Sequence, residues 1–257
     1  MIEIIVTLLF SSFNLGALGT IVLWQRIVNI GDSLSHAIIF SFVIEYFFKL
    51  PQALGCVIVA VIFTICARFL SKTSSGQNLS MIVLSSMAIA ITFLVSDLSG
   101  GDFKIKDFIV GDILSCGRDE MYISIAVSIL VIFFLYFKFR EIVLFSISED
   151  IAKVNAINVK NLKIYISIIL ALAIAVFIQV IGALLMTAFL VIPASVARIV
   201  SKSPKRMLFV SILISLISSL VSFVISMNYD ISFSACSIIL LSVIYIAVNI
   251  RHIKFHS

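Results

Sequence analysis

Apolar residues gather along this chain in runs long enough to cross a membrane. A transmembrane helix needs about 20 consecutive, mostly apolar residues. Nine runs approach or reach this length, and short polar connections separate most of them: 4–24, 31–48, 52–70, 79–98, 121–137, 164–182, 184–200, 207–227 and 234–250. The pattern therefore predicts an all-α, polytopic membrane protein with about nine transmembrane helices.

The sixth and seventh runs are the weakest part of this prediction. They form one long apolar stretch that is interrupted only by Gly182 and Pro193. Glycine and proline both weaken the interior of a helix, so the second half of the stretch could be a short or broken helix. Eight full spans plus a partial one is the alternative prediction.

The composition agrees with a membrane protein. Hydrophobic residue types make up 62% of the 257 residues and charged types only 12%, whereas a soluble domain carries about 25% charged residues. The runs leave no room for a soluble domain, so we expect a single transmembrane domain over residues 1–257. The net charge of +5 comes from basic residues beside the runs, which indicates topology in a lipid bilayer and no nucleic-acid partner.

Lysine and arginine orient the chain, because cytoplasmic loops carry an excess of both. If the N-terminus lies outside and nine spans alternate, the cytoplasmic side receives 14 of the 18 basic residues and the outside receives 4. This distribution places the loops 141–163 and 201–206 and the C-terminus in the cytoplasm.

Small residues lie at helical spacing in two of the predicted spans. Gly16 and Gly19 lie in the first span, and five serines follow one face of the eighth: Ser211, Ser215, Ser219, Ser222 and Ser226. Small residues let transmembrane helices approach each other closely. Helix packing is therefore the favoured interpretation, with a polar conduit wall as the alternative.

The cytoplasmic loop 141–163 contains a short amphipathic pattern. Glu149 and Asp150 open it, and acidic residues stabilise a helix N-terminus. If a helix continues through residues 149–159, one face carries Ile151, Val154 and Asn158, and an adjacent face carries Ala152, Ala156 and Val159. We expect this short helix to be a docking element.

The segment GDSLSHA, residues 31–37, places two polar residues inside the second span. Asp32 and His36 are four residues apart, which puts both side chains on one face of a helix. An ionised aspartate at the centre of a span costs about 2.5–3.5 kcal/mol, so such residues face a partner or a cavity.

Three explanations for this pair remain open. The two side chains could satisfy each other and nearby hydroxyls such as that of Ser35, they could relay protons, or they could be ligands along a cation path. Imidazole nitrogen and carboxylate oxygen together suit Zn²⁺, Mn²⁺ or Fe²⁺. One chain supplies only two such ligands, whereas two copies related by a two-fold axis would supply four.

Enzyme signatures are missing from the sequence, which contains no HExxH, no Gly-x-Ser-x-Gly and no Walker A loop. The protein cannot hydrolyse ATP by itself, and we expect no permanently bound cofactor. Residues 15–37, LGALGTIVLWQRIVNIGDSLSHA, instead resemble the signature of the membrane permeases of bacterial metal-uptake ABC transporters. Three further stretches are similar to elements of that family: FIVGDIL (108–114), SEDIAKVNAINV (148–159) and VIGALLMTAFLVIPASVARI (180–199).

The resemblance implies a type II ABC importer-like fold, with one permease domain that forms a homodimer in the bacterial plasma (inner) membrane. It also implies a cytoplasmic ATP-binding subunit, an extracytoplasmic metal-binding protein, and a substrate path at the two-fold axis that Asp32 and His36 line as transient metal ligands. The coupling helix of the family would dock on the ATPase through residues of the 148–159 stretch: Glu149, Asp150, Ile151, Val154 and Ala156. The family usually carries glycine at the position of Ala156.

The transported ion is left open by the sequence. Zinc is the first choice because imidazole suits it, and manganese or iron is the alternative within the same family, since both share these ligands. A proton-coupled secondary metal transporter, with Asp32 and His36 as the relay, is the rival from another class. Such transporters often show internal inverted repeats, and no convincing repeat is found here.

Overall fold

The computed structural model describes residues 1–70, 74–99, 105–111, 113 and 116–256. These residues form helices and connections and include no strand. The helices are α1 (Ile2–Trp24), α2 (Ile30–Ile38), α3 (Ser41–Phe48), α4 (Gln52–Phe69), α5 (Ser74–Ser99), α6 (Ile105–Val110), α7 (Arg118–Ile147), α8 (Glu149–Val154), α9 (Val159–Ile181), α10 (Ala183–Val200), α11 (Pro204–Tyr229) and α12 (Phe233–His256).

Nine helices long and apolar enough to cross a membrane are present in the part of the chain that the structure describes, with α2 and α3 counted together as one span. The nine-span prediction is confirmed, and the alternative of eight spans plus a partial one is wrong. The long apolar stretch breaks at Gly182, whose φ of 82° lies outside the helical region, while Pro193 stays inside α10. Transmembrane helices tolerate proline because neighbouring groups satisfy the backbone that it frees.

The second span is jointed, although the sequence predicts 31–48 as one uninterrupted run. Helix α2 ends at Ile38 and α3 begins at Ser41. Between them, the amides of Ile39 and Phe40 bond to carbonyls three residues earlier, at 3.3 and 3.0 Å. Such tight 3₁₀-like bonding changes the direction of the chain without glycine or proline, and this is why the residue pattern does not reveal the joint.

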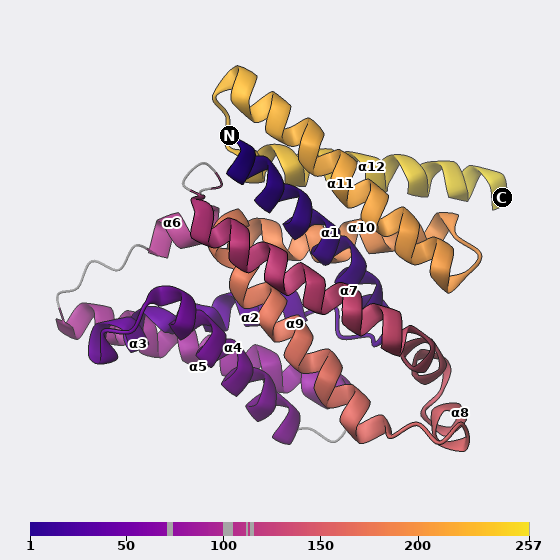
Figure 1. The fold of residues 1–257 in the computed structure, drawn as a ribbon, viewed down its shortest axis with the longest axis horizontal. Coiled ribbons are helices and arrows are strands. Elements are labelled where there is room, and N and C mark those ends of the chain that lie inside the picture. Colours follow the sequence, from indigo (N-terminus) through magenta and orange to yellow (C-terminus); the bar gives the residue numbers. More distant parts are fainter. Residues whose placement is uncertain (71–73, 100–104, 112, 114–115, 257) are drawn as a thin grey trace.

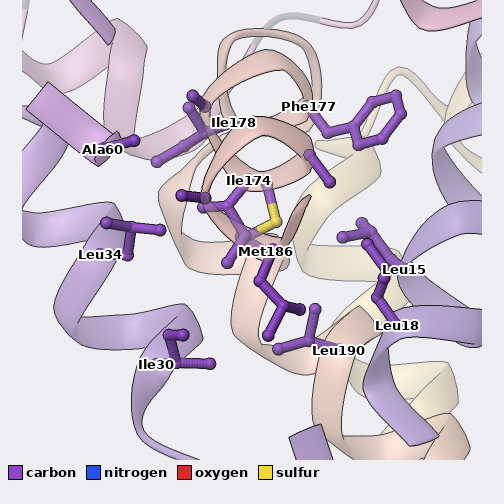
Figure 2. Close-up of a cluster of buried hydrophobic side chains, with 14 of the residues drawn as sticks. Leu15, Leu18, Ile30, Leu34, Ala60, Ile174, Phe177, Ile178, Met186 and Leu190 are labelled. Carbon is purple, nitrogen blue, oxygen red and sulfur yellow. The ribbon is translucent and has the colours of Figure 1, made fainter. Parts of the chain in front are cut away.

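Helix α9 lies near the centre of the bundle, between α2–α5 on one side and α1 with α10–α12 on the other (Figure 1). The side chains labelled in Figure 2 come from α1, α2, α4, α9 and α10 and meet in the core. All ten labelled residues are fully buried: Leu15, Leu18, Ile30, Leu34, Ala60, Ile174, Phe177, Ile178, Met186 and Leu190. Lipid is as apolar as these side chains, so close van der Waals packing holds the helices together.

Small residues bring α1 against α10 and α11, as predicted. Ser211 and Ser215 of α11 donate hydrogen bonds of 2.6 and 2.7 Å to the carbonyls of Gly16 and Ser12 in α1. A Cβ on Gly19 would overlap the Leu190 carbonyl of α10. The packing interpretation is confirmed for these residues, whereas Ser226 is half-buried and donates a hydrogen bond to the nearby Ile231 carbonyl.

The two ends of the bundle carry different connections (Figure 1). The N-terminus, α6 and the connection from α11 to α12 lie toward one end. Helix α8, the connection from α10 to α11, and the C-terminus lie toward the other. An odd number of spans requires this separation of the two termini.

Candidate functional site

Asp32 and His36 lie side by side on the one open face of α2. The Asp32 Oδ2 and His36 Nδ1 atoms are 3.8 Å apart, and their side chains are 62% and 44% exposed. The neighbouring residues Ser33, Leu34 and Ser35 are buried. The helix therefore turns its other faces inward and presents this pair at the surface of the single chain.

Close packing of α2 fixes the direction in which the pair points. A Cβ on Gly31 would stand 3.5 Å from the Cα of Thr187 and 3.4 Å from Leu190, both in α10. Leu34 and Ile38 continue this contact into the core with no exposed surface. Because α2 lies in contact with α10, α9, α4 and α5, the Asp32–His36 face is the face left uncovered.

The chemistry of the pair is that of an incomplete metal site. One imidazole nitrogen and one carboxylate oxygen suit a divalent transition metal. Among the described residues, no group of three or more His, Cys, Asp or Glu side chains could hold a metal ion. A single chain thus offers two ligands of these types, and water or a second chain would have to complete the coordination shell.

The Ser35 hydroxyl forms no hydrogen bond with Asp32 or His36, contrary to one explanation considered from the sequence. The Ser35 hydroxyl is buried and has no hydrogen-bond partner among the described residues. The distance of 3.8 Å between Asp32 and His36 also exceeds that of a hydrogen bond. The two side chains are close enough to coordinate one ion, but no hydrogen bond joins them.

An apolar groove lies farther along the second span, and the sequence did not reveal it. Phe40 and Ile44 continue the four-residue spacing of Asp32 and His36 beyond the α2–α3 joint. Together with α4 and α5, they line a hollow of ≈ 270 Å³ that also includes Val59, Ile62, Phe63, Cys66, Leu84, Met87 and Ile91. The shape of the groove depends on the α2–α3 joint and on how this span packs against α4 and α5, which the sequence does not reveal.

The short helix expected at 149–159 is present as α8, but it ends at Val154. Ser148 caps it by accepting a 3.2 Å hydrogen bond from the Asp150 amide. Buried Ala152 anchors it, while Ile151 and Val154 are 42% and 87% exposed. The 141–163 loop therefore presents an apolar, exposed pair on a helix that begins with Glu149 and Asp150.

Beyond Val154 the chain turns, so the predicted helical faces that include Ala156, Asn158 and Val159 are wrong. Ala156 adopts a left-handed backbone with φ of 57°, which explains why glycine suits this position. Asn158 instead caps α9 by accepting a 3.2 Å hydrogen bond from the Asn161 amide. Ala156 thus belongs to the connection between α8 and α9.

The element 108–114 is described except for residues 112 and 114, so part of the predicted motif lies outside the described residues. Phe108 of α6 is buried and meets the ring of Phe42, with centroids 5.6 Å apart. Gly111 and Gly182 both have positive φ, and a Cβ on either would overlap the other's backbone. Ser234 of α12 donates to the carbonyls of Val110 and Ile181, at 2.7 and 3.2 Å, which closes the junction.

The same architecture is found in a solved structure described as an inward-facing conformation of a putative metal-chelate type ABC transporter, which aligns with 97% of this chain and 85% of its own, with a TM-score of 0.76 at 15% identity. The structure described as PsaBC from Streptococcus pneumoniae in complex with Fab aligns with 96% of this chain and 89% of its own, with a TM-score of 0.83 at 18% identity. The predicted fold class, all-α and like a type II ABC importer, is confirmed. The family model of the ABC 3 transport family matches residues 1–252, and the chain belongs to this family.

Curated relatives cover nearly the same length. The high-affinity zinc uptake system membrane protein ZnuB of Buchnera aphidicola subsp. Schizaphis graminum is 28% identical over 244 residues, 93% of each chain. A probable iron transport system membrane protein of Haemophilus influenzae is 27% identical over 87% of this chain and 83% of its own. These relatives are membrane components of transport systems, as the sequence resemblance predicted.

Proposed function

We propose that this protein imports a divalent metal cation, zinc in the first place, as the membrane-spanning subunit of an ABC transporter. The observation that carries the proposal is the exposed Asp32–His36 pair on a helix that is otherwise buried. A charged side chain in a membrane span is costly, so its retention indicates a role in a path. The zinc relative named above supports the choice of metal.

In this proposal a homodimer completes the path. Each copy contributes one imidazole and one carboxylate, and the apolar groove lies farther along the same span. A second copy seated against this span would bring four ligands to the axis. The ligands are few per chain, so the ion is released more readily than from a closed structural site.

The ATPase contact is assigned to α8 and the turn that follows it. Ile151 and Val154 offer an exposed apolar surface, with Glu149 and Asp150 at the start of the helix and Ala156 at its end. A separate cytoplasmic ATP-binding subunit would receive these residues, and an extracytoplasmic metal-binding protein would deliver the ion at the opposite end. The C-terminus is then cytoplasmic, at the same end of the bundle as α8.

Uptake of radioactive zinc tests this proposal. Cells that express the chain with its ATPase subunit and binding protein should accumulate zinc, and cells without the ATPase subunit should not. Uptake that persists without the ATPase and follows a proton gradient would establish the rival secondary transporter. Stronger competition by manganese or iron than by unlabelled zinc would assign one of those metals as the substrate of the same path.

A further inference from the structure

A hollow of ≈ 500 Å³ lies between the cytoplasmic ends of α7 and α9 and the turn after α8. We call it the interfacial pocket. Its polar lining consists of Lys138, Arg140, Glu141, Asn155, Asn158, Asn161 and Tyr165, and its apolar lining includes Phe137, Leu144, Ile157 and Leu162. The volume lies within the range of small-molecule sites.

The interfacial pocket lies at the depth of lipid headgroups. Residues 121–137 of α7 carry no charge and span about 25 Å at 1.5 Å per residue, close to the hydrocarbon thickness of a bilayer. Lys138 is the first basic residue after this run. On the facing helix, Lys163 is the last charged residue before the uncharged run of α9, and Tyr165 is the second residue of that run.

The charges of the pocket favour an anion. Lys138 forms a 2.7 Å ion pair with Glu141, which neutralises both side chains. Arg140 is exposed and forms no ion pair within the described part of the chain. Guanidinium binds phosphate oxygens in a bidentate manner, and the amide of Asn161 lies in the same lining as a further donor.

Above these polar groups the wall is aromatic and open to the membrane. Phe137 and Tyr165 are 59% and 48% exposed, and the exposed surface continues up α7 through Phe133 at 65%. Tyrosine is typical of the boundary between headgroups and acyl chains. An occupant of this pocket therefore contacts polar groups on its cytoplasmic side and apolar rings on its membrane side.

We propose that the interfacial pocket binds an anionic phospholipid of the cytoplasmic leaflet, with its phosphate on Arg140 and Asn161 and its acyl region against Phe137 and Tyr165. Basic pockets between transmembrane helices on the cytoplasmic side bind such headgroups. Free phosphate shares the headgroup chemistry but lacks the apolar part that the aromatic rings contact. The exposed aromatic wall also favours lipid over a water-soluble protein surface.

Lipid in this pocket would also brace the α8–α9 connection. Asn155, Ala156, Ile157 and Asn158 form one wall of the pocket, and they follow directly on α8. Occupancy thus restricts the turn that sets the position of α8. Lipid binding itself needs neither metal nor ATP. The lipid proposal can therefore fail while the proposed transport function holds, and lipid can bind even if the proposed transport function is wrong.

Native mass spectrometry of the detergent-purified permease tests this site, with phosphatidylglycerol and phosphatidylcholine of identical acyl chains as probes. The wild type should retain phosphatidylglycerol in preference to phosphatidylcholine. Arg140→Gln should weaken phosphatidylglycerol binding about tenfold, as expected for the loss of one charge-assisted contact, and Asn161→Ala should weaken it in the same direction. Arg206→Gln is the matched control, because Arg206 is an exposed basic residue outside the pocket.

Four results would overturn the assignment. Equal retention of the two lipids by the wild type would exclude an anionic site, and equal losses in Arg140→Gln and Arg206→Gln would indicate general surface charge. Displacement of the lipid by millimolar inorganic phosphate would identify free phosphate as the ligand. If Arg140→Gln left lipid binding unchanged but released the cognate ATPase subunit, the pocket would be a protein contact instead.

Discussion

Among the described residues, four non-glycine residues adopt a left-handed backbone, and each lies within two residues of the end of a helix. Arg26 follows α1, Lys49 follows α3, Ala156 follows α8 and Asp230 follows α11, with φ between 51° and 58°. A side chain in this conformation costs about 1–2 kcal/mol relative to a right-handed one. The protein accepts this cost where the chain must reverse direction.

Replacing Ala156 by glycine should stabilise the protein. Glycine reaches the left-handed conformation without strain, and this gain exceeds the added chain entropy of the unfolded state, so the net effect is up to about 1 kcal/mol. The apparent melting midpoint in detergent should rise by about 2–4 °C. Ala152→Gly, inside α8, is the control and should lower the midpoint. A fall of the same size in Ala156→Gly would contradict the left-handed turn.

Gly182 should tolerate no side chain. Its φ of 82° and ψ of 159° belong to a region that is essentially restricted to glycine, which costs other residues about 1–3 kcal/mol, and a Cβ would overlap the backbone of Val110. Gly182→Ala should therefore reduce the yield of folded protein and its melting midpoint. Gly117→Ala should change neither, since its Cβ would meet only the flexible carboxylate of Glu120 at 3.1 Å. A wild-type melting midpoint for Gly182→Ala would show that Gly182 is not closely packed against the backbone of Val110.

At the scale of elements, Lys163 holds α8 against the bundle. Its ammonium pairs with Glu149 of α8 and lies 5.2 Å from the ring centroid of Phe145 in α7. The pair is partly exposed, so it contributes only about 0.2–1 kcal/mol. Lys163→Met should therefore leave the fold intact but increase amide hydrogen exchange in 149–156 about two- to fivefold.

Lys160→Met supplies the control for this measurement, because Lys160 is exposed on the same helix and outside the ion pairs found among the described residues. Its exchange profile should match that of the wild type. Unchanged exchange in Lys163→Met would mean that buried Ala152 alone holds α8 in place.

The sequence predicted the extents of the membrane-spanning helices better than it predicted the breaks between helices. Long, mostly apolar runs predicted all nine spans, because a helix satisfies its backbone groups within one segment in lipid. The α2–α3 joint arises at Ile39–Phe40 from a local change in hydrogen bonding that leaves the composition unchanged. The end of α8 at Val154 depends on the left-handed backbone of Ala156. An alanine in the sequence does not indicate this conformation.

At the scale of the whole molecule, the chain should expose α8 and the α10–α11 connection to the cytoplasm. In a cysteine-free background, Lys153→Cys and Lys202→Cys should resist an impermeant thiol reagent in intact cells and react after permeabilisation. Tyr229→Cys, at the opposite end of the bundle and 76% exposed, should react in intact cells. Labelling of the first two from outside would reverse the orientation.

The site was predictable in part. The four-residue spacing placed Asp32 and His36 on one helix face, and the structure brings their polar atoms to 3.8 Å. The apolar groove farther along this span could not be predicted, since it combines Phe40 of the α2–α3 joint with Ile62 of α4 and Met87 of α5. Spacing along one helix is a local property, whereas the shape of a surface depends on how helices pack.

ATP-driven zinc flux into proteoliposomes tests the central claim most directly, with the permease, its ATPase subunit and its binding protein reconstituted together. The measurement compares wild type with His36→Gln, which keeps a polar side chain but lacks a good metal ligand, and with His252→Gln near the C-terminus as the matched control. Loss of a ligand should lower flux about tenfold or more, with ATPase assembly intact, while His252→Gln transports at the wild-type rate. Wild-type flux in His36→Gln would contradict the account, because the pair would then be a polar contact without a role in the path.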